Sequence, residues 1–144
     1  MGLFEIYTRF TGRSPSPMKP TFVIIGAQKA GTTALFAMLK EHPDIVAPSK
    51  KEIHHFDNDE SYEKGMRHYL SHFPVSTSLR SSVVTFEATP SYLFYADKCA
   101  PRIRRHLPNT TCVAILRDPV KRAFSAWNMF RDFKEHPTYC HLYD

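Results

Sequence analysis

Long apolar runs are missing from this 144-residue chain, since no stretch approaches the ~20 consecutive apolar residues that a membrane-spanning helix needs. Cysteine is scarce, and the three present (Cys99, Cys112 and Cys140) show no C-x-x-C metal spacing, so we expect free thiols. There is no internal repeat and no low-complexity tract. What remains, 42% hydrophobic and 23% charged residues, fits one globular domain with a core of ordinary size.

Acidic residues are fewer than basic residues in this chain. The formal net charge of +5 favours an anionic partner, either an anionic nucleotide or sugar or a nucleic acid. The basic residues are dispersed along the chain, and aromatic residues are not spaced along basic strands as in nucleic-acid-binding modules. We therefore expect a small anionic ligand and no nucleic acid.

A glycine-containing loop follows the apolar run 21–25, and residues 26–33 read GAQKAGTT. A strand, a glycine turn and a helix start leave backbone N–H groups aimed at one point, where the helix dipole adds roughly half a positive charge. In the triphosphate-binding version, G-x-x-x-x-G-K-[ST], a lysine follows the second glycine. Here Thr32 occupies that position, and Lys29 is the cation of the loop. The loop predicts a phosphate site whose lysine reaches a 5′-phosphate and its leaving oxygen.

The hydrophobic pattern predicts alternating strands and helices after an extended, mobile leader over residues 1–20. A single domain would then run from residue 21 to residue 144. We expect strands at 21–25, 82–87 and 111–116, and helices at 31–42, 60–73 and 97–107. On the second helix, four residues at helical spacing form a core-packing face: Tyr62, Met66, Tyr69 and Phe73. Such alternation predicts a parallel sheet with helices on both faces.

Ligands of such sheets bind beyond the carboxyl ends of the strands, where Gly26, Ala88 and Arg117 are expected to meet. After the third strand, Asp118 can cap a helix whose first residue is Pro119. Arg117 presents a fork of donors suited to a phosphate. Ser125 lies away from the apolar stripe of this helix (Val120, Phe124 and Trp127), so it is available to a ligand.

Four blocks occur in order: residues 26–33 (GAQKAGTT), 50–57 (KKEIHHFD), 86–92 (FEATPSY) and 116–125 (LRDPVKRAFS). In this order they resemble the sulfotransferases that use 3′-phosphoadenylyl sulfate, above all the carbohydrate-acting branch with its heparan-type enzymes and bacterial relatives. The resemblance runs from about residue 21 to residue 131. It implies a three-layer α/β fold with a P-loop-like parallel sheet flanked by helices. The resembled domains continue beyond the length of this chain, so their C-terminal part is expected to be missing here.

The resemblance implies transfer of a sulfuryl group from 3′-phosphoadenylyl sulfate to a hydroxyl of a carbohydrate, with adenosine 3′,5′-bisphosphate as product. Lys29 would stabilise the leaving phosphate and Glu52 would take the hydroxyl proton. His54 and His55 would touch the acceptor, and either is an alternative base. The donor-binding residues carried over are Gly26, Gln28, Lys29, Ala30, Gly31, Thr32, Thr33, Arg117 and Ser125.

Several alternatives stay open. Glu52 also fits a solvated ion pair with Lys50 or Lys51. His54, His55 and Asp57 contain metal-ligand types, but adjacent histidines point in different directions, so no metal is expected. A P-loop kinase and a non-catalytic nucleotide- or glycan-binding module are the competing functions.

One residue departs from the resembled pattern. Several heparan-type enzymes carry a lysine where this chain has Ala88, which leaves the acceptor open. The N-terminus shows no signal-peptide pattern and favours the cytoplasm, whereas the resemblance favours the Golgi lumen. From its length we expect the chain to bind the bisphosphate weakly and to transfer little sulfate.

Overall fold

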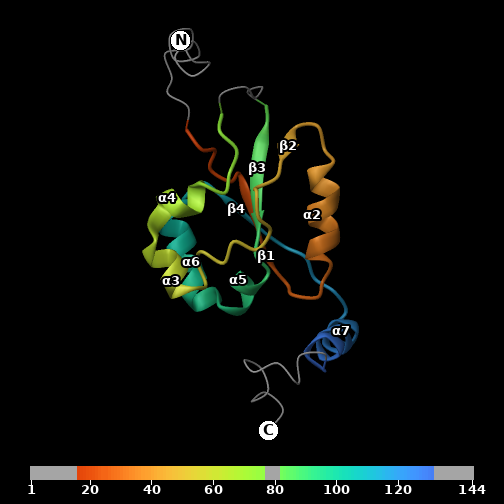
Figure 1. Cartoon of the computed structure of the whole chain (residues 1–144). Coiled ribbons are helices and arrows are strands. Elements are labelled where there is room, and N and C mark those ends of the chain that lie inside the picture. Colours follow the sequence, from red (N-terminus) through yellow and green to blue (C-terminus); the bar gives the residue numbers. More distant parts are fainter. Residues whose placement is uncertain (1–15, 77–81, 132–144) are drawn as a thin grey trace, which may run out of the picture.

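Four parallel strands form the centre of the computed structural model, which describes residues 16–76 and 82–131 (Figure 1). The strands are β1 (Phe22–Gly26), β2 (Ile45–Val46), β3 (Val84–Ala88) and β4 (Thr111–Ala114). Their order is β2-β3-β1-β4, and each neighbouring pair is parallel. In register, Phe22 lies opposite Phe86 on one side and Thr111 on the other. The predicted parallel α/β fold is confirmed.

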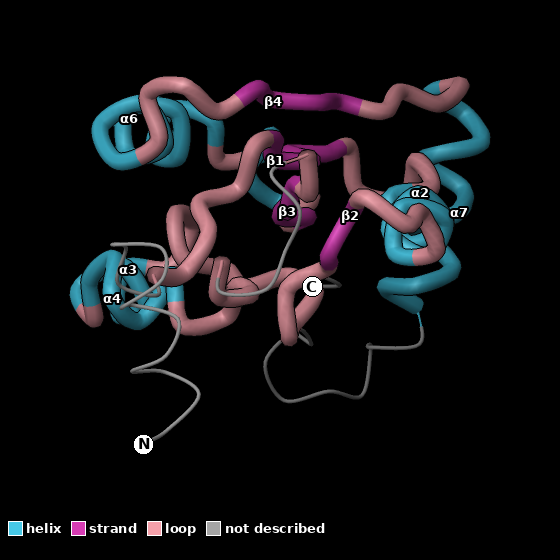
Figure 2. The backbone as a smooth tube through the Cα atoms, turned by 90° about the horizontal axis from the view of Figure 1, so that it is seen from above, coloured by secondary structure: helices cyan, strands magenta, loops and turns pink. Residues whose placement is uncertain are grey.

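Helices cover both faces of this sheet, as the view from above in Figure 2 shows. On one face lies α2 (Thr32–Lys40). The other face is covered by α3 (Asp59–Glu63), α4 (Gly65–Leu70), α5 (Ser91–Phe94) and α6 (Ala96–His106). The last described helix, α7 (Pro119–Arg131), follows β4 and lies beyond the carboxyl ends of the strands (Figure 1).

The central strand β1 is apolar on both faces, which is why it reads as a continuous hydrophobic run. Val23 and Ile25 contribute to the core under α4, α5 and α6. Phe22 and Ile24 contribute to the second core, under α2, where the rings of Phe22 and Phe86 stack with centroids 5.3 Å apart. Two packed cores therefore hold β1 from both sides, and its carboxyl end can present a loop in a defined position.

The helix predicted over 60–73 is wrong as a single element. It is divided into α3 and α4 at Lys64, and Gly65 has a φ of 77°, a left-handed value that favours glycine. The Asn58 side chain caps α3 by accepting a hydrogen bond of 2.8 Å from the N–H of Ser61. The predicted core-packing face is confirmed, since Tyr69 and Phe73 are buried with Tyr62 and Met66 packed against them.

Other boundaries also differ from the prediction. The short helix α5 precedes α6, and the two-residue strand β2 is too short to produce a hydrophobic pattern. Residues 16–18, at the end of the expected leader, are tied to the fold: Pro17 bridges Val75, and the N–H of Met18 donates to the carbonyl of Pro74 at 2.8 Å. That part of the leader is extended as predicted, but it is hydrogen-bonded and not a free arm. Residues 1–15 lie outside the described residues.

Gly26 ends β1 at a point of close approach. A Cβ atom built at this position would lie 2.7 Å from the Cβ of Leu93 in α5 and 3.0 Å from the carbonyl oxygen of Pro90. Any side chain here would push α5 away from the loop. The glycine therefore lets the segment after β3 pack against the loop after β1, which brings two of the sequence blocks together.

Candidate active site

The carboxyl ends of β1, β3 and β4 open onto a cleft of about 370 Å³. Residues from all four sequence blocks line it: Gln28, Lys29, Gly31, Thr32, Thr33, Glu52, His54, Pro90, Ser91, Arg117, Ser125 and Met129. Of the predicted site residues, Gly26, Ala30 and His55 are not among these lining residues.

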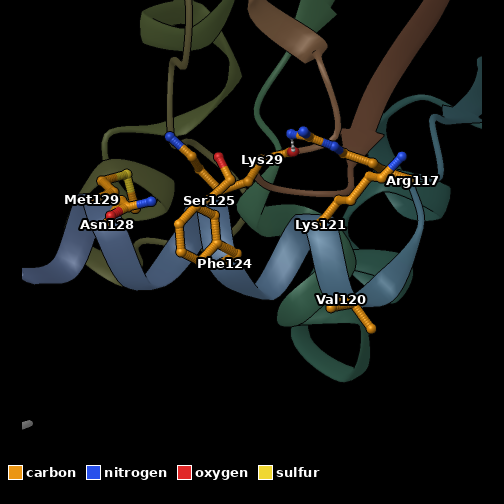
Figure 3. Close-up of a pocket in the computed structure, with 8 residues that line it drawn as sticks. All are labelled: Lys29, Arg117, Val120, Lys121, Phe124, Ser125, Asn128 and Met129. Atoms are coloured by element: carbon orange, nitrogen blue, oxygen red, sulfur yellow. Dashed lines mark hydrogen bonds between the residues drawn. The ribbon is translucent and has the colours of Figure 1, made fainter.

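A second, wider cleft of about 730 Å³ adjoins the first along α7. Lys29, Arg117, Ser125 and Met129 line both clefts, so the two are continuous. The wider cleft adds apolar surface from Val120 and Phe124, and polar groups from Lys121 and Asn128 (Figure 3).

The N-terminus of α2 forms one end of the smaller cleft. Its N-cap is Gly31 with a φ of 106°, no side chain caps the helix, and no acidic residue lies in its first turn. The first amides of a helix have no partner within the helix, and the dipole makes this end positive. Gly31 and Thr33 are exposed, whereas Thr32 is buried. This end of the cleft therefore fits an anion such as a phosphate.

Arg117 connects the loop after β1 with the segment after β4. Its guanidinium donates a hydrogen bond of 3.2 Å to the backbone carbonyl of Lys29, drawn as a dashed line in Figure 3. The guanidinium thus binds a carbonyl of the phosphate loop, in addition to the phosphate role that its fork of donors predicts. Because Arg117 is exposed and lines both clefts, its remaining donors face ligand space.

The start of α7 is as predicted. Pro119 is its first residue, and the carboxylate of Asp118 accepts a hydrogen bond of 2.9 Å from the N–H of Lys121. Ser125 lies two turns further and is half-buried between the clefts.

The apolar stripe on α7 is not packed against the sheet. Val120, Phe124 and Trp127 are 76%, 64% and 53% exposed, because the helix lies beyond the ends of the strands. The stripe therefore lies on the surface in the part of the chain that the structure describes.

Glu52, His54 and Asp57 form a chain of charged groups across the cleft wall. The Nε2 atom of His54 lies 3.7 Å from Oε2 of Glu52, and its Nδ1 atom lies 2.8 Å from Oδ2 of Asp57. Asp57, whose side chain is only 6% exposed, also accepts a hydrogen bond of 2.5 Å from the hydroxyl of Ser91. The other oxygen of Glu52 contacts the ammonium group of Lys51, so the ion pair considered from the sequence is present.

These contacts set the protonation states. Hydrogen bonds from His54 and Lys51 hold the pKa of Glu52 at about 2, although partial burial opposes this. The Asp57 bond, supported by Glu52, raises the pKa of His54 to about 9. Burial raises the pKa of Asp57, but the bonds from His54 and Ser91 outweigh it and the pKa is lowered. At neutral pH, Glu52 is therefore an ionised carboxylate facing the cleft, held beside an imidazolium that cannot accept a further proton.

Backbone strain is concentrated around the same cleft. Among the described residues, the non-glycine residues with positive φ are Lys29 at 67°, Glu52 at 58° and His54 at 55°. All three line the cleft. Left-handed conformations of this kind cost on the order of 1–3 kcal/mol each and persist where the surrounding structure enforces them, commonly at functional sites.

His55 lies in the core and not in the cleft. It is fully buried, and its ring stacks on Tyr69 with centroids 4.8 Å apart and contacts the rings of Phe56 and Tyr62. Burial lowers the pKa of His55 to about 4, so it is neutral at pH 7. The structure thus gives no support to an acceptor contact by His55. The two adjacent histidine side chains therefore lie in different surroundings: His54 lines the cleft, and His55 lies in the core.

Sequence reasoning missed the part played by Asp57 and Ser91. The i,i+3 spacing of His54 and Asp57 was visible, but the partner hydroxyl comes from a segment 34 residues away. Ala88, the residue that departs from the resembled pattern, is fully buried in the core under α2. Its carbonyl accepts a hydrogen bond of 3.0 Å from the N–H of Glu52. The segment after β3 thus contributes backbone and hydroxyl groups to the site.

Comparison with known proteins places these features in context. The family described as sulfotransferase domain matches residues 19–142. The chain is 40% identical over 109 residues to the membrane-associated sulfotransferase kil1 of Dictyostelium discoideum, covering 76% of this chain and 22% of that protein. It is 38% identical over 116 residues to heparan sulfate glucosamine 3-O-sulfotransferase 5 of Mus musculus, covering 81% of this chain and 32% of that enzyme.

A solved structure is also similar. The sulfotransferase from Alicyclobacillus acidocaldarius aligns with a TM-score of 0.66 and 33% identity, covering 85% of this chain and 55% of that one. The chain thus spans about a fifth to a third of the two curated relatives and about half of the bacterial protein. None of the helices in the part described here is long and apolar enough to cross a bilayer.

Proposed function

Because this chain belongs to the sulfotransferase domain family, we propose that its cleft binds 3′-phosphoadenylyl sulfate and supports transfer of the sulfuryl group to a carbohydrate hydroxyl. One observation carries the proposal. A single cleft combines an uncapped helix N-terminus and a lysine, suited to a phosphate, with an ionised carboxylate suited to a hydroxyl proton. Sulfuryl transfer needs these two functions side by side.

The donor end is supported by the chemistry of its lining residues. The backbone N–H groups of Gly31, Thr32 and Thr33, with the threonine hydroxyls, would hold the 5′-phosphate. Lys29 would neutralise the charge that develops on this phosphate as its bond to sulfur breaks. Arg117 and Ser125 would hold the 3′-phosphate, the group that distinguishes this donor from ATP.

Glu52 is the proposed general base. It would accept the proton of the acceptor hydroxyl while the hydroxyl oxygen bonds to sulfur and adenosine 3′,5′-bisphosphate departs. With a pKa of about 2, the free carboxylate is a weak base, so it is suited to accept the proton late, as the hydroxyl acidifies. His54, held by Asp57, would keep Glu52 turned toward the cleft and stabilise its charge.

The acceptor class rests on the relatives and on charge. The mouse relative is named for heparan sulfate, and a net charge of +5 favours an anionic acceptor, so we propose a carbohydrate that carries negative charge. Ala88 stands where several heparan-type enzymes carry lysine, so the particular sugar stays open.

Calorimetric titration with adenosine 3′,5′-bisphosphate, ATP with Mg²⁺ and 5′-AMP tests the donor. We expect the bisphosphate to bind at least ~10-fold more tightly than either, a difference of about 1.4 kcal/mol. Tighter binding of Mg-ATP would instead favour a kinase. Transfer of labelled sulfate from the donor to a desulfated glycan series then separates an enzyme from a binding module, which would bind the nucleotide without transfer.

A further inference from the structure

A fully buried carboxylate lies behind the cleft, at the end of β3. Glu87 has no solvent exposure, and three hydroxyl groups donate to it: Tyr69 at 2.5 Å, Tyr92 at 2.6 Å and Thr89 at 2.9 Å. Burial raises the pKa of this carboxyl against the three hydroxyl bonds, which lower it. A buried carboxylate that accepts three hydroxyl hydrogen bonds is costly to assemble, and such an arrangement requires its neighbours to lie in defined positions.

Tyr92 connects this carboxylate by hydrogen bonds to the loop that carries the proposed base. Its hydroxyl has a single proton, which it donates to Oε1 of Glu87. The lone pairs of the same oxygen accept from the backbone N–H groups of His55 at 3.1 Å and Phe56 at 3.4 Å. Because the hydroxyl proton points at the carboxylate, the lone pairs of the hydroxyl oxygen point toward the loop. The carboxylate therefore sets the orientation of the hydroxyl group that accepts hydrogen bonds from the loop.

The same short segment holds the loop at two further points. The carbonyl of Ala88 accepts from the N–H of Glu52, and the hydroxyl of Ser91 donates to Asp57. The loop 52–57 contains two residues in left-handed conformation, Glu52 and His54, which need external support to persist. Residues 88–92 supply that support at the beginning, the middle and the end of the loop.

We propose that Glu87 and Tyr92 are positioning residues, which hold the loop 52–57 in the shape that presents Glu52 and His54 to the cleft. The catalytic consequence rests on the proposed sulfotransferase function, whereas the effect on loop geometry does not. Neither residue lines the cleft, so they act through the loop backbone and not on the substrate.

The chain offers a matched pair of variants, Tyr92→Phe and Tyr69→Phe. Each removes one hydroxyl from the same carboxylate, and both side chains are buried, but only Tyr92 also bonds the loop. We expect amide exchange at His55 and Phe56, measured by NMR, to be at least ~10-fold faster in Tyr92→Phe and within about twofold of wild type in Tyr69→Phe. The pKa of His54, about 9 in the intact loop, should fall toward 6.5 only in Tyr92→Phe.

In the transfer assay, Tyr92→Phe should lower kcat about 10-fold, with the KM for the donor and the Kd for the bisphosphate changed less than about twofold. Equal effects of the two variants on exchange and on His54 would overturn the proposal, because the carboxylate would then act only on stability. Unchanged exchange in Tyr92→Phe would overturn it as well.

Failure of the proposed function gives a different result: wild type would neither bind the bisphosphate nor transfer sulfate, while the amide and His54 readouts still separate the variants. If Tyr92→Phe does not fold, Glu87→Gln and Glu87→Met replace it. The glutamine keeps an oxygen toward Tyr92 and Thr89 and should retain loop protection, whereas methionine should lose it. Equal protection in both would contradict the proposal.

Discussion

The two sides of the cleft are built by different means. The phosphate side consists of the loop after β1 and the start of α2, where backbone amides, a glycine cap and one lysine make the site. The side that carries Glu52 depends on side chains from two segments, with Lys51, His54 and Asp57 from its own loop and Ser91 from the segment after β3 setting the charge of one carboxylate. A backbone-built site is encoded within eight consecutive residues. A site built from side chains exists only after distant segments have packed.

The largest effect is expected from the side-chain-built half. Glu52→Gln removes the proposed base without changing the size of the side chain, so transfer should fall by ~10²–10⁴-fold in kcat. The Kd for adenosine 3′,5′-bisphosphate, measured by calorimetry, should change little, because the phosphate side is separate. Glu60→Gln on the exposed face of α3 is the control and should have wild-type kcat. Parallel loss of nucleotide binding in Glu52→Gln would show that the two sides are not independent.

Lys29→Ala tests the phosphate side. The lysine is the cation of its loop, and removal of one electrostatic donor to a developing negative charge costs on the order of 3–4 kcal/mol, or ~10²–10³ in transfer rate. Lys40→Ala, at the exposed far end of α2, provides the matched loss of one charge without loss of the site. A Lys29→Ala protein with more than about a third of wild-type turnover contradicts the role of the lysine.

Arg117→Ala addresses the border between the two clefts. Loss of charge-assisted hydrogen bonds should weaken binding of the bisphosphate by about 1.5–3 kcal/mol, whereas binding of 5′-AMP should barely change. Titrations of both nucleotides give the difference, with the exposed Arg104→Ala as control. Equal weakening of both nucleotides would instead indicate that Arg117 acts through its bond to the Lys29 carbonyl, by holding the phosphate loop.

The last effect concerns the pH dependence of stability at the two adjacent histidines. Burial lowers the pKa of His55 to about 4. Between pH 6.5 and 4, the histidine is therefore protonated in the unfolded chain but stays neutral in the folded chain. Stability is then full above pH 6.5 and falls as the pH drops toward 4, by up to roughly 3 kcal/mol. Urea unfolding at pH 7.5, 5.5 and 4.5 measures the free energy of unfolding at each pH. The His55→Phe variant should show a weaker pH dependence, and the surface variant His42→Gln should show the same pH dependence as wild type.

His54 gives the opposite sign. Its pKa is raised to about 9, so its contribution is present below pH 6.5 and is lost as the pH rises through 9. The side chain is 45% exposed, so solvent screens the effect and a much shallower slope is expected than for His55. A steeper slope on the alkaline side than on the acid side would reverse this comparison of the two neighbours.

Prediction from the sequence succeeded where a local pattern determines structure. The run at 21–25, the glycine loop, and Asp118 with Pro119 each specify one element by propensity or capping, and all three lie where expected. Prediction from the sequence failed where packing against distant segments determines the structure. The periodicity of 60–73 was correct for packing, but the break at Gly65 was not recognised, and the α7 stripe has the pattern of a core face while lying exposed.

The sequence by itself determined the phosphate loop, the parallel α/β fold and the membership of residues from four blocks in one site, because each rests on local backbone geometry or on strand order. Only the tertiary structure decided that His54 faces the cleft while His55 lies in the core. It alone also decided that Glu87 is buried and accepts hydrogen bonds from three hydroxyl groups. Burial and hydrogen-bond partners depend on which distant segments pack together. For that reason the charge of Glu52 and the support of its loop follow from contacts made in space and not from neighbours along the chain.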